Sequence, residues 1–251
     1  MAGMNLLNQN QPTSTSGHRH EESSGNVFCF VSNHLEFDEI VAAPEVLDQI
    51  GFTGMVVTDH NASTDSLKQR GFQLHDLAEL KPVFDLSQWV TATPLSSEEI
   101  WMAHEKQPYV SLGVDIAIAD DLQRRKHEAA TLFQIAASPV PVVRINAALL
   151  YSTTYREQRE LLRSLVFWRK RFEVSRHRPR LVHSGDDGLL IFIIDSWLIS
   201  VNMNPDEATI DLGQQGSMWL MLGSQRDVHL HGSMLVLPPY SGAIVANEAA
   251  R

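Results

Sequence analysis

Cysteine, long apolar runs and glycine-rich loops are all scarce in this chain of 251 residues. Cys29 is the single cysteine, so no intrachain disulfide can form, and its place inside an apolar run is typical of an inert core thiol. Residues 1–26 carry no apolar signal core, and we therefore expect a reducing, cytoplasmic setting. No apolar run approaches the roughly 18 residues of a membrane span, which argues against an integral membrane protein.

Signatures of several enzyme classes are also missing. The sequence contains no G-x-S-x-G nucleophile elbow, and no glycine loop has the helix-opening spacing that cradles a phosphate. The composition itself is ordinary for a chain that buries a core, with 43% hydrophobic and 20% charged residues.

Positive charge is in deficit overall but is concentrated in one place. The chain has 20 Lys and Arg against 30 Asp and Glu, a net charge of -10. Residues 156–180 hold nine of those basic residues and only three acidic ones. An acidic body repels nucleic acid at long range, so no nucleic-acid partner is expected. The basic stretch is a solvated helix face or, less commonly, a local site for an anion or a partner.

The pattern along the chain predicts a tail followed by two kinds of structure. Residues 1–25 are polar and aperiodic, so we expect a disordered tail, with the HRH at 18–20 simply solvated. Short, continuously apolar runs then alternate with helical stretches, which is typical of a β/α domain. The predicted strands are 27–31, 53–57, 109–118 and 140–145, and the predicted helices are 43–50, 65–79 and 124–136.

Beyond this region the sequence predicts a long amphipathic helix followed by a series of short β-strands. Residues 154–174 repeat apolar side chains at helical spacing, and the chain breaks at 176–179. Evenly spaced short runs with turn signals then predict an antiparallel sandwich of about 70 residues. Those runs are 189–194, 198–203, 209–212, 218–222, 233–237 and 243–246. The predicted organisation is a tail (1–25), a β/α domain (26–153), a connecting helix (154–179) and a β domain (180–251).

Four stretches resemble motifs of one family. Residues 30–38 (FVSNHLEFD) resemble a seventh-strand motif FLRNHDELDL, and residues 112–122 (LGVDIAIADDL) an eighth-strand motif YGDEIGMGDDL. The stretch from 143 (VRINAALLYSTTYREQRELLRSLVFWRKR) is similar to a segment leading into a last barrel helix, and residues 237–242 (LPPYSG) to a closing LPPYEG. Together they resemble the C-terminal end of the α-amylase superfamily of glycoside hydrolases, nearest the trehalose synthase and maltose glucosyltransferase branch. The match spans roughly 27–247, except for 40–108.

This resemblance implies an α/β partial, or incomplete, TIM-barrel-like domain followed by an amylase-type C-terminal β-sandwich. A complete barrel takes about 250 residues and eight strands. Only about 125 residues and at most four predicted strands precede the connecting helix, so one copy cannot close a barrel. We therefore expect an open sheet covered by helices, or an exposed edge that pairs with another chain in a homo- or hetero-oligomer.

The family's catalytic carboxylates are missing by the same resemblance. Its nucleophile and acid lie on strands that precede everything in this sequence. The third carboxylate should follow Asn33 and His34, where Leu35 stands, and a leucine accepts no hydrogen bonds from sugar hydroxyls. Asp115 represents the eighth-strand glutamate. The implied function is non-catalytic, a pseudoenzyme that binds a glucan, another oligosaccharide or a protein, with no catalytic residue, no cofactor and no metal.

Two enzymatic alternatives stay open. In the first, a small carbohydrate-active hydrolase or transglycosylase has rebuilt its site from the carboxylates of Glu36, Asp59, Asp115 and Asp120, with His34 and His60 assisting. In the second, Thr58–Asn61 (TDHN) belongs to a PHP-like metal-dependent phosphoesterase, whose site needs several converging His and Asp ligands. The vestigial or ligand-binding candidates shared by these hypotheses are Asn33, His34, Asp59, His60, Asp115 and Asp120.

Two further sets of side chains have a structural and a functional interpretation. His229 and His231 lie on one face of a predicted strand at the spacing of two metal ligands, but an exposed polar face explains them more simply. Five aromatic residues could stack on a sugar, although core packing is the default. They are Trp89, Trp101, Trp197, Trp219 and Tyr240.

Overall fold

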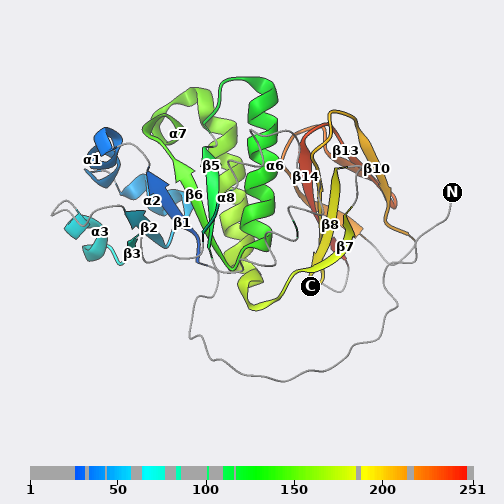
Figure 1. Cartoon of the computed structure of the whole chain (residues 1–251), viewed down its shortest axis with the longest axis horizontal. Coiled ribbons are helices and arrows are strands. Elements are labelled where there is room, and N and C mark those ends of the chain that lie inside the picture. The colour runs from blue at the N-terminus through cyan, green and yellow to red at the C-terminus, as the bar shows by residue number, and fades with distance from the viewer. Residues whose placement is uncertain are drawn as a thin grey trace.

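The protein is a mixed α/β chain with one parallel sheet and two antiparallel sheets (Figure 1). A computed structural model describes residues 26–31, 34–42, 44–57, 64–76, 83–85, 101, 110–115, 117–184, 188–213 and 218–247. At 34–36, 83–85, 110–112, 114 and 115 it describes the backbone only. Within these residues no helix is long and apolar enough to cross a membrane.

The parallel sheet has six strands in the first part of the chain. They are β1 (Phe28–Val31), β2 (Gly54–Val57), β3 (Gln73–Asp76), β4 (Val83–Asp85), β5 (Val110–Asp115) and β6 (Val140–Ile145). The helices are α1 (His34–Ala42), α2 (Glu45–Ile50), α3 (Asp65–Gln69), α6 (Asp121–Ala137), α7 (Ala147–Tyr151) and α8 (Arg156–Arg171), with short 3-10 turns at η2 (Thr153–Tyr155) and η3 (Val174–Arg176).

The strand order in this sheet is β3-β2-β1-β6-β5-β4. Every neighbouring pair is consecutive in sequence except β1 and β6, the first and last strands, which pair in parallel with Phe28 opposite Val142. This is the cyclic order of a ring of six strands that is open between β3 and β4. Those two strands are therefore the edges of the sheet in the described part of the chain.

The expectation of at most four strands here was wrong. β3 falls inside the segment 65–79 that was predicted to be one helix. α3 ends at Gln69 because Gly71 takes a left-handed conformation (φ 84°), and the chain then turns into the sheet. β3 escaped notice because Leu74 is its single apolar side chain, which is common for an edge strand. α1 was also missed, since β1 ends at Val31 and a helix begins at His34.

The antiparallel sheets contain eight strands from the second part of the chain. Their bounds are β7 (Arg180–Ser184), β8 (Leu189–Ile194), β9 (Trp197–Asn202), β10 (Ala208–Asp211), β11 (Met218–Gly223), β12 (His229–His231), β13 (Met234–Leu237) and β14 (Ser241–Asn247). One sheet has the order β11-β14-β9-β8-β7 and the other β10-β13-β12. Apolar residues from both, such as Ile191 and Leu235, form one buried cluster. The predicted runs agree with β8, β9, β10, β11, β13 and β14 to within about two residues.

Helix α6 is the centre of the molecule. Figure 1 shows it standing between β5 and β6 on one side and β14 on the other. All eleven residues from His127 to Ala137 are buried. Close approach is allowed by small residues on both sides: a Cβ at Gly113 of β5 would lie 2.3 Å from Gln134 Oε1, and one at Gly242 of β14 would lie 3.2 Å from Leu132. The parallel sheet, α6, α8 and the five-stranded antiparallel sheet thus share one core cluster.

Helix α8 confirms the amphipathic helix predicted over 154–174, with its ends tightened into η2 and η3. Leu162, Leu165 and Trp168 are fully buried in the shared core. Arg169 is fully buried as well, and its guanidinium donates to the carbonyl oxygens of Ile135 (2.6 Å) and Pro139 (2.7 Å). It therefore satisfies the carbonyl end of α6, where a positive charge is favoured. Burial lowers the pKa of Arg169 to about 9.

Replacing Arg169 by Met should destabilise the protein because one buried and one partly buried carbonyl group lose their donor. We expect Arg169→Met to lower the free energy of unfolding by about 2–4 kcal/mol in urea denaturation. The control is Arg171→Met on the exposed side of the same helix, which should change it by less than about 0.5 kcal/mol. Equal effects of the two substitutions would contradict the capping role.

Candidate functional site

A hollow of about 860 Å³ lies where α6, α8 and the turn between β11 and β12 meet. We call it the α6–α8 hollow. Its lining is strongly charged, with four arginines and three carboxylates, and also includes the apolar side chains of Leu161 and Leu222. The lining residues are Arg124, Arg125, Arg156, Glu157, Glu160, Leu161, Ser164, Leu222, Gly223, Ser224, Gln225, Arg226 and Asp227.

Arg124 links two carboxylates at the start of α6. It pairs with the exposed Asp121 one turn earlier and donates to Glu128 Oε1 at 3.2 Å one turn later. The Glu128 side chain is only 3% exposed, and its Oε2 is buried with no hydrogen-bond partner. Burial raises the pKa of Glu128 to about 7 despite the nearby guanidinium. Hydrogen bonding by Arg124, in contrast, lowers the pKa of Asp121.

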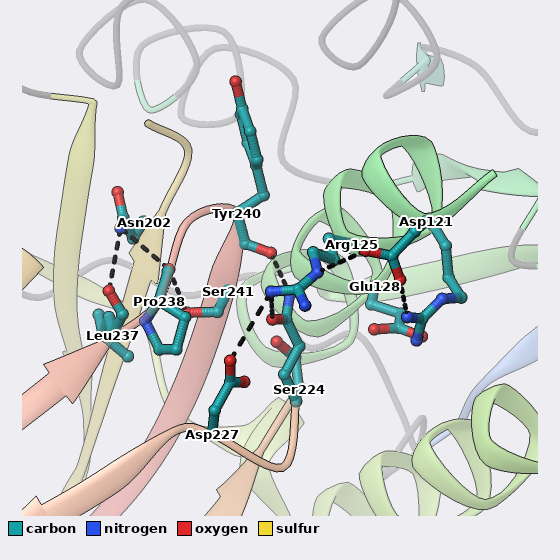
Figure 2. A network of polar contacts seen from close by, with 12 residues as sticks. Asp121, Arg125, Glu128, Asn202, Ser224, Asp227, Leu237, Pro238, Tyr240 and Ser241 are labelled. Atoms are coloured by element: carbon teal, nitrogen blue, oxygen red, sulfur yellow. Dashed lines mark hydrogen bonds and ion pairs between the residues drawn. The ribbon is translucent and has the colours of Figure 1, made fainter. Parts of the chain in front are cut away.

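Arg125 ties α6 to the antiparallel sheets (Figure 2). Its guanidinium bonds Asp121 Oδ2 (3.1 Å) and Gln225 Oε1 (2.8 Å), and lies 3.8 Å from Asp227 Oδ2. Gln225 Nε2 in turn donates to the carbonyl oxygen of Tyr240 at 2.6 Å. The turn that carries Gln225 and Asp227 is therefore held by side chains of α6.

The closing motif at 237–242 has a structural role. Asn202 is fully buried and donates from Nδ2 to the carbonyl oxygens of Leu237 (3.2 Å) and Pro238 (3.1 Å). Ser241 Oγ donates to Pro238 O at 2.7 Å, and Tyr240 has a left-handed backbone (φ 51°). These contacts shape the turn that presents the Tyr240 carbonyl to Gln225 (Figure 2).

A second ion pair spans the hollow from the other side. Arg226 Nη2 lies 2.5 Å from Glu157 Oε1 on α8. Glu157 thus accepts a guanidinium N–H, whereas Asp227 forms a longer ion pair with Arg125. Glycoside hydrolysis needs one carboxylic acid that donates a proton beside a second carboxylate, and an ion-paired acceptor is the opposite of such a donor.

The predicted site residues do not gather in this hollow. Asp120 is the N-cap of α6, where its side chain accepts from the backbone N–H of Gln123 at 2.8 Å, so its role is to cap a helix. His34 begins α1 directly after β1, and Asp115 is the last residue of β5. The backbone therefore places these two at the carboxyl edge of the parallel sheet. Asn33, Asp59, His60 and the rest of the TDHN motif lie outside the described residues.

Two acidic residues at this edge were missed from the sequence. Asp76 ends β3 and Asp85 ends β4, so three strands of the sheet, with Asp115 on β5, finish on an aspartate. The sequence signal for each of them was an acidic residue at the end of a short strand. This pattern is too common to indicate a site before the strands have been assigned. In parallel sheets the carboxyl edge is where ligand sites form.

The metal and sugar-stacking interpretations gain no support from the described residues. His229 and His231 are exposed with ring centroids 4.8 Å apart, which confirms their shared face, but the described part of the chain has no cluster of three or more His, Cys, Asp or Glu able to hold a metal. Trp101 and Trp197 are buried, and the partly buried Trp219 packs against the core, so core packing is confirmed for them. Trp89 lies outside the described residues.

Cys29 is a core thiol as predicted. Its side chain is completely buried in β1, with Sγ 3.6 Å from the Gly54 carbonyl oxygen. Burial raises the pKa of the thiol far above its ordinary value. A group that stays protonated and inaccessible is not a nucleophile.

No protein-family profile and no curated protein sequence matches this chain. Matches to solved structures are distant. A pullulanase from Paenibacillus barengoltzii has 12% identity and a TM-score of 0.42, covering 55% of this chain and 29% of that one. Ttha1563 from Thermus thermophilus has 15% identity and a TM-score of 0.49, covering 84% and 62%. Eubacterium rectale Amy13B has 10% identity and a TM-score of 0.48, covering 89% and 60%.

The chain spans less than two thirds of the length of each of these proteins. Similarity at this level assigns this chain neither a family nor an activity.

Replacing Glu128 by Gln should change how stability depends on pH. The folded-state pKa of about 7 lies above the ordinary 4.5, so the native state holds this proton more tightly than the unfolded state. The contribution of Glu128 to stability is full below about pH 4.5 and declines as pH rises toward 7. Glu128→Gln cannot titrate, so its stability relative to the wild type should rise by up to about 3 kcal/mol over that window.

The measurement is urea unfolding of both proteins at half-unit steps from pH 4 to 8. Taking the difference at each pH cancels the other titrating groups. A difference that stays constant across the range would show that Glu128 is solvated in the folded protein.

Proposed function

We propose that this chain is a non-catalytic, amylase-like protein that acts by binding a partner, and that the α6–α8 hollow with the adjoining face of α8 is its binding surface. The observation that carries the proposal is the pairing of Glu157 with Arg226 and of Asp227 with Arg125. These pairs engage two of the three carboxylates that line the hollow, Glu160 being the third, and a carboxylate held by a guanidinium is poorly placed to donate a proton to a glycosidic oxygen.

The strand order supports a partial barrel as the fold behind this proposal. Residues 77–82 link Asp76 to Val83, a reach of at most about 25 Å. In a flat sheet β3 and β4 would lie five spacings apart, about 24 Å, and the link must also return along the strands by roughly 10 Å or more. A flat sheet would need about the whole reach of the link, so the short link favours a sheet that curls toward a ring. The proposed units are the β/α domain at 26–153, the connecting helix at 154–179 and an amylase-type sandwich at 180–251. The proposed likeness to the trehalose synthase branch rests on the sequence motifs alone.

A protein fits the surface better than a glucan. Sugar rings stack on exposed aromatic faces, and the residues that line the two hollows of this surface include a single aromatic side chain, Phe167. The hollow is instead lined by arginines, a residue type enriched at protein interfaces. Binding of a glucan or oligosaccharide is the competing outcome.

The proposal predicts no turnover of glucosides. Purified protein incubated with maltose, trehalose, maltooligosaccharides and nitrophenyl glucoside should release glucose or nitrophenol no faster than buffer does. Turnover that Asp115→Asn lowers by about 10²-fold or more, with Asp211→Asn of β10 as the unaffected control, would overturn it.

One observation favours a rebuilt carbohydrate-active site as the second candidate. Asp76, Asp85 and Asp115 end three strands at the carboxyl edge of the parallel sheet. Asp120 stays a proposed member of this candidate set, although one oxygen of its side chain also caps α6. The PHP-like hypothesis stays with Asp59 and His60, and metal analysis of untagged protein is its test.

Self-association is the remaining part of the proposal. The described edge strands β3 and β4 have hydrogen-bonding positions on one side that no other described strand occupies. We expect light scattering to give a mass of at least twice 28.1 kDa. A stable mass of one chain at every concentration would contradict this expectation.

A further inference from the structure

A second, smaller hollow adjoins the first along α8. It has a volume of about 360 Å³ and shares Glu160, Ser164 and Leu222 with the α6–α8 hollow. Phe167 of α8 and Met221 of β11 line it, with exposed fractions of 61% and 38%. An apolar pair exposed in a depression is unusual for a solvated surface and typical of an interaction site.

The exposure of Met221 has a specific structural cause. Along β11, Met218 and Leu220 pack against one core cluster, and Trp219 and Leu222 against the other. The register with β14 shifts between Leu220 and Leu222, so Met221 is the extra residue of a β-bulge. A bulge on an edge strand re-aims a side chain, and this one turns a methionine outward beside Phe167.

The exposed stripe of α8 carries unpaired positive charge. Arg156, Glu160, Arg163 and Phe167 recur at helical spacing, so they share one face. In the described part of the chain, neither Arg156 nor Arg163 has a hydrogen bond or an ion pair, whereas Arg124, Arg125 and Arg226 are paired with carboxylates. The stripe therefore joins one apolar anchor point to two guanidinium groups that have no partner in the described part of the chain, with the exposed Glu160 carboxylate between them.

We propose that this groove, formed by the α8 stripe and the bulge of β11, docks an acidic segment of a partner protein that carries an apolar anchor residue. The inference rests on the proposed binding function and names the partner's chemistry. Charge complementarity argues for it, because free guanidinium groups recognise carboxylates. The apolar pair argues against a nucleic acid, because a phosphate backbone offers no apolar anchor residue to the Phe167 and Met221 side chains.

The spacing along α8 specifies the segment. Phe167 and Arg163 are about 6 Å apart along the helix axis, and Arg163 and Arg156 about 10 Å. An extended peptide advances about 3.3 Å per residue, so these distances correspond to about two and three residues. The expected motif is an apolar residue, one spacer, an acid, two spacers and a second acid, in either chain direction.

Panning of phage-displayed random 12-residue peptides on the immobilised full chain tests this. Enriched peptides should share the apolar–x–acid–x–x–acid spacing. A labelled consensus peptide, measured by fluorescence anisotropy, should bind R156E/R163E at least about tenfold more weakly than wild type, and Met221→Ser should weaken binding by a similar factor. Binding should also weaken as salt rises from 50 to 500 mM, as expected for exposed charges.

Two matched controls separate the groove from general surface effects. Arg178→Glu reverses an exposed charge outside the groove, and Met234→Ser removes a methionine with the same 38% exposure on β13. Both should keep the wild-type affinity within twofold, and all variants should keep the wild-type thermal midpoint within a few degrees.

Several results would overturn the docking site. They are the absence of enriched peptides, enrichment without the acidic spacing, or equal loss with R178E and R156E/R163E. Tighter, arginine-dependent binding of heparin, duplex DNA or maltoheptaose in the same assay would also overturn it, as would a dimer that R156E/R163E dissociates. Glucoside turnover would instead overturn the non-catalytic function, so the two failures are distinguishable.

Discussion

The burial of α6 on every side from His127 to Ala137 is the constraint on which the rest of the structure depends. A helix between a parallel and an antiparallel sheet needs close contacts on both faces, and Gly113 and Gly242 provide them. Because no face of its second half meets water, that half has almost no room for charge. The polar groups of α6 are accordingly concentrated in its first turns, and its carbonyl end needs a donor from elsewhere.

Side-chain contacts therefore tie both ends of α6 to other elements. Arg169 of α8 satisfies the carbonyl end, while Arg125 at the amino end reaches the turn between β11 and β12. Many of the charged side chains that line the α6–α8 hollow form ion pairs or hydrogen bonds between the two halves of the chain. This explains why two of its three carboxylates, Glu157 and Asp227, are ion-paired. The side chains outside these ties include Arg156, Arg163 and the apolar pair beside them.

The strength of the local sequence pattern decided how well each helix or strand could be predicted. β1, β2, β6 and β8 are short, continuously apolar runs, and their predicted bounds agree with the structure to within one residue. β3 lies at a sheet edge, where few side chains are buried, and it has a single apolar residue. It therefore lacks the apolar pattern of a strand and was predicted as helix. The capping role of Asp120 could have been predicted, since Asp followed three residues later by Gln is a capping signature. The resemblance of this stretch to a family motif favoured a role in sugar binding instead.

Apolar periodicity and charge segregation along the chain were enough to establish the alternating β/α region, the amphipathic α8 and the β-rich end, because these signals are local. The cyclic strand order with β1 against β6, the double burial of α6 and the meeting of α8 with the bulge of β11 were not accessible in this way. Each joins segments far apart in sequence, and nothing in a local pattern states which distant surface will cover it. The candidate site lies at such a meeting point, which is why the tertiary structure was needed to find it.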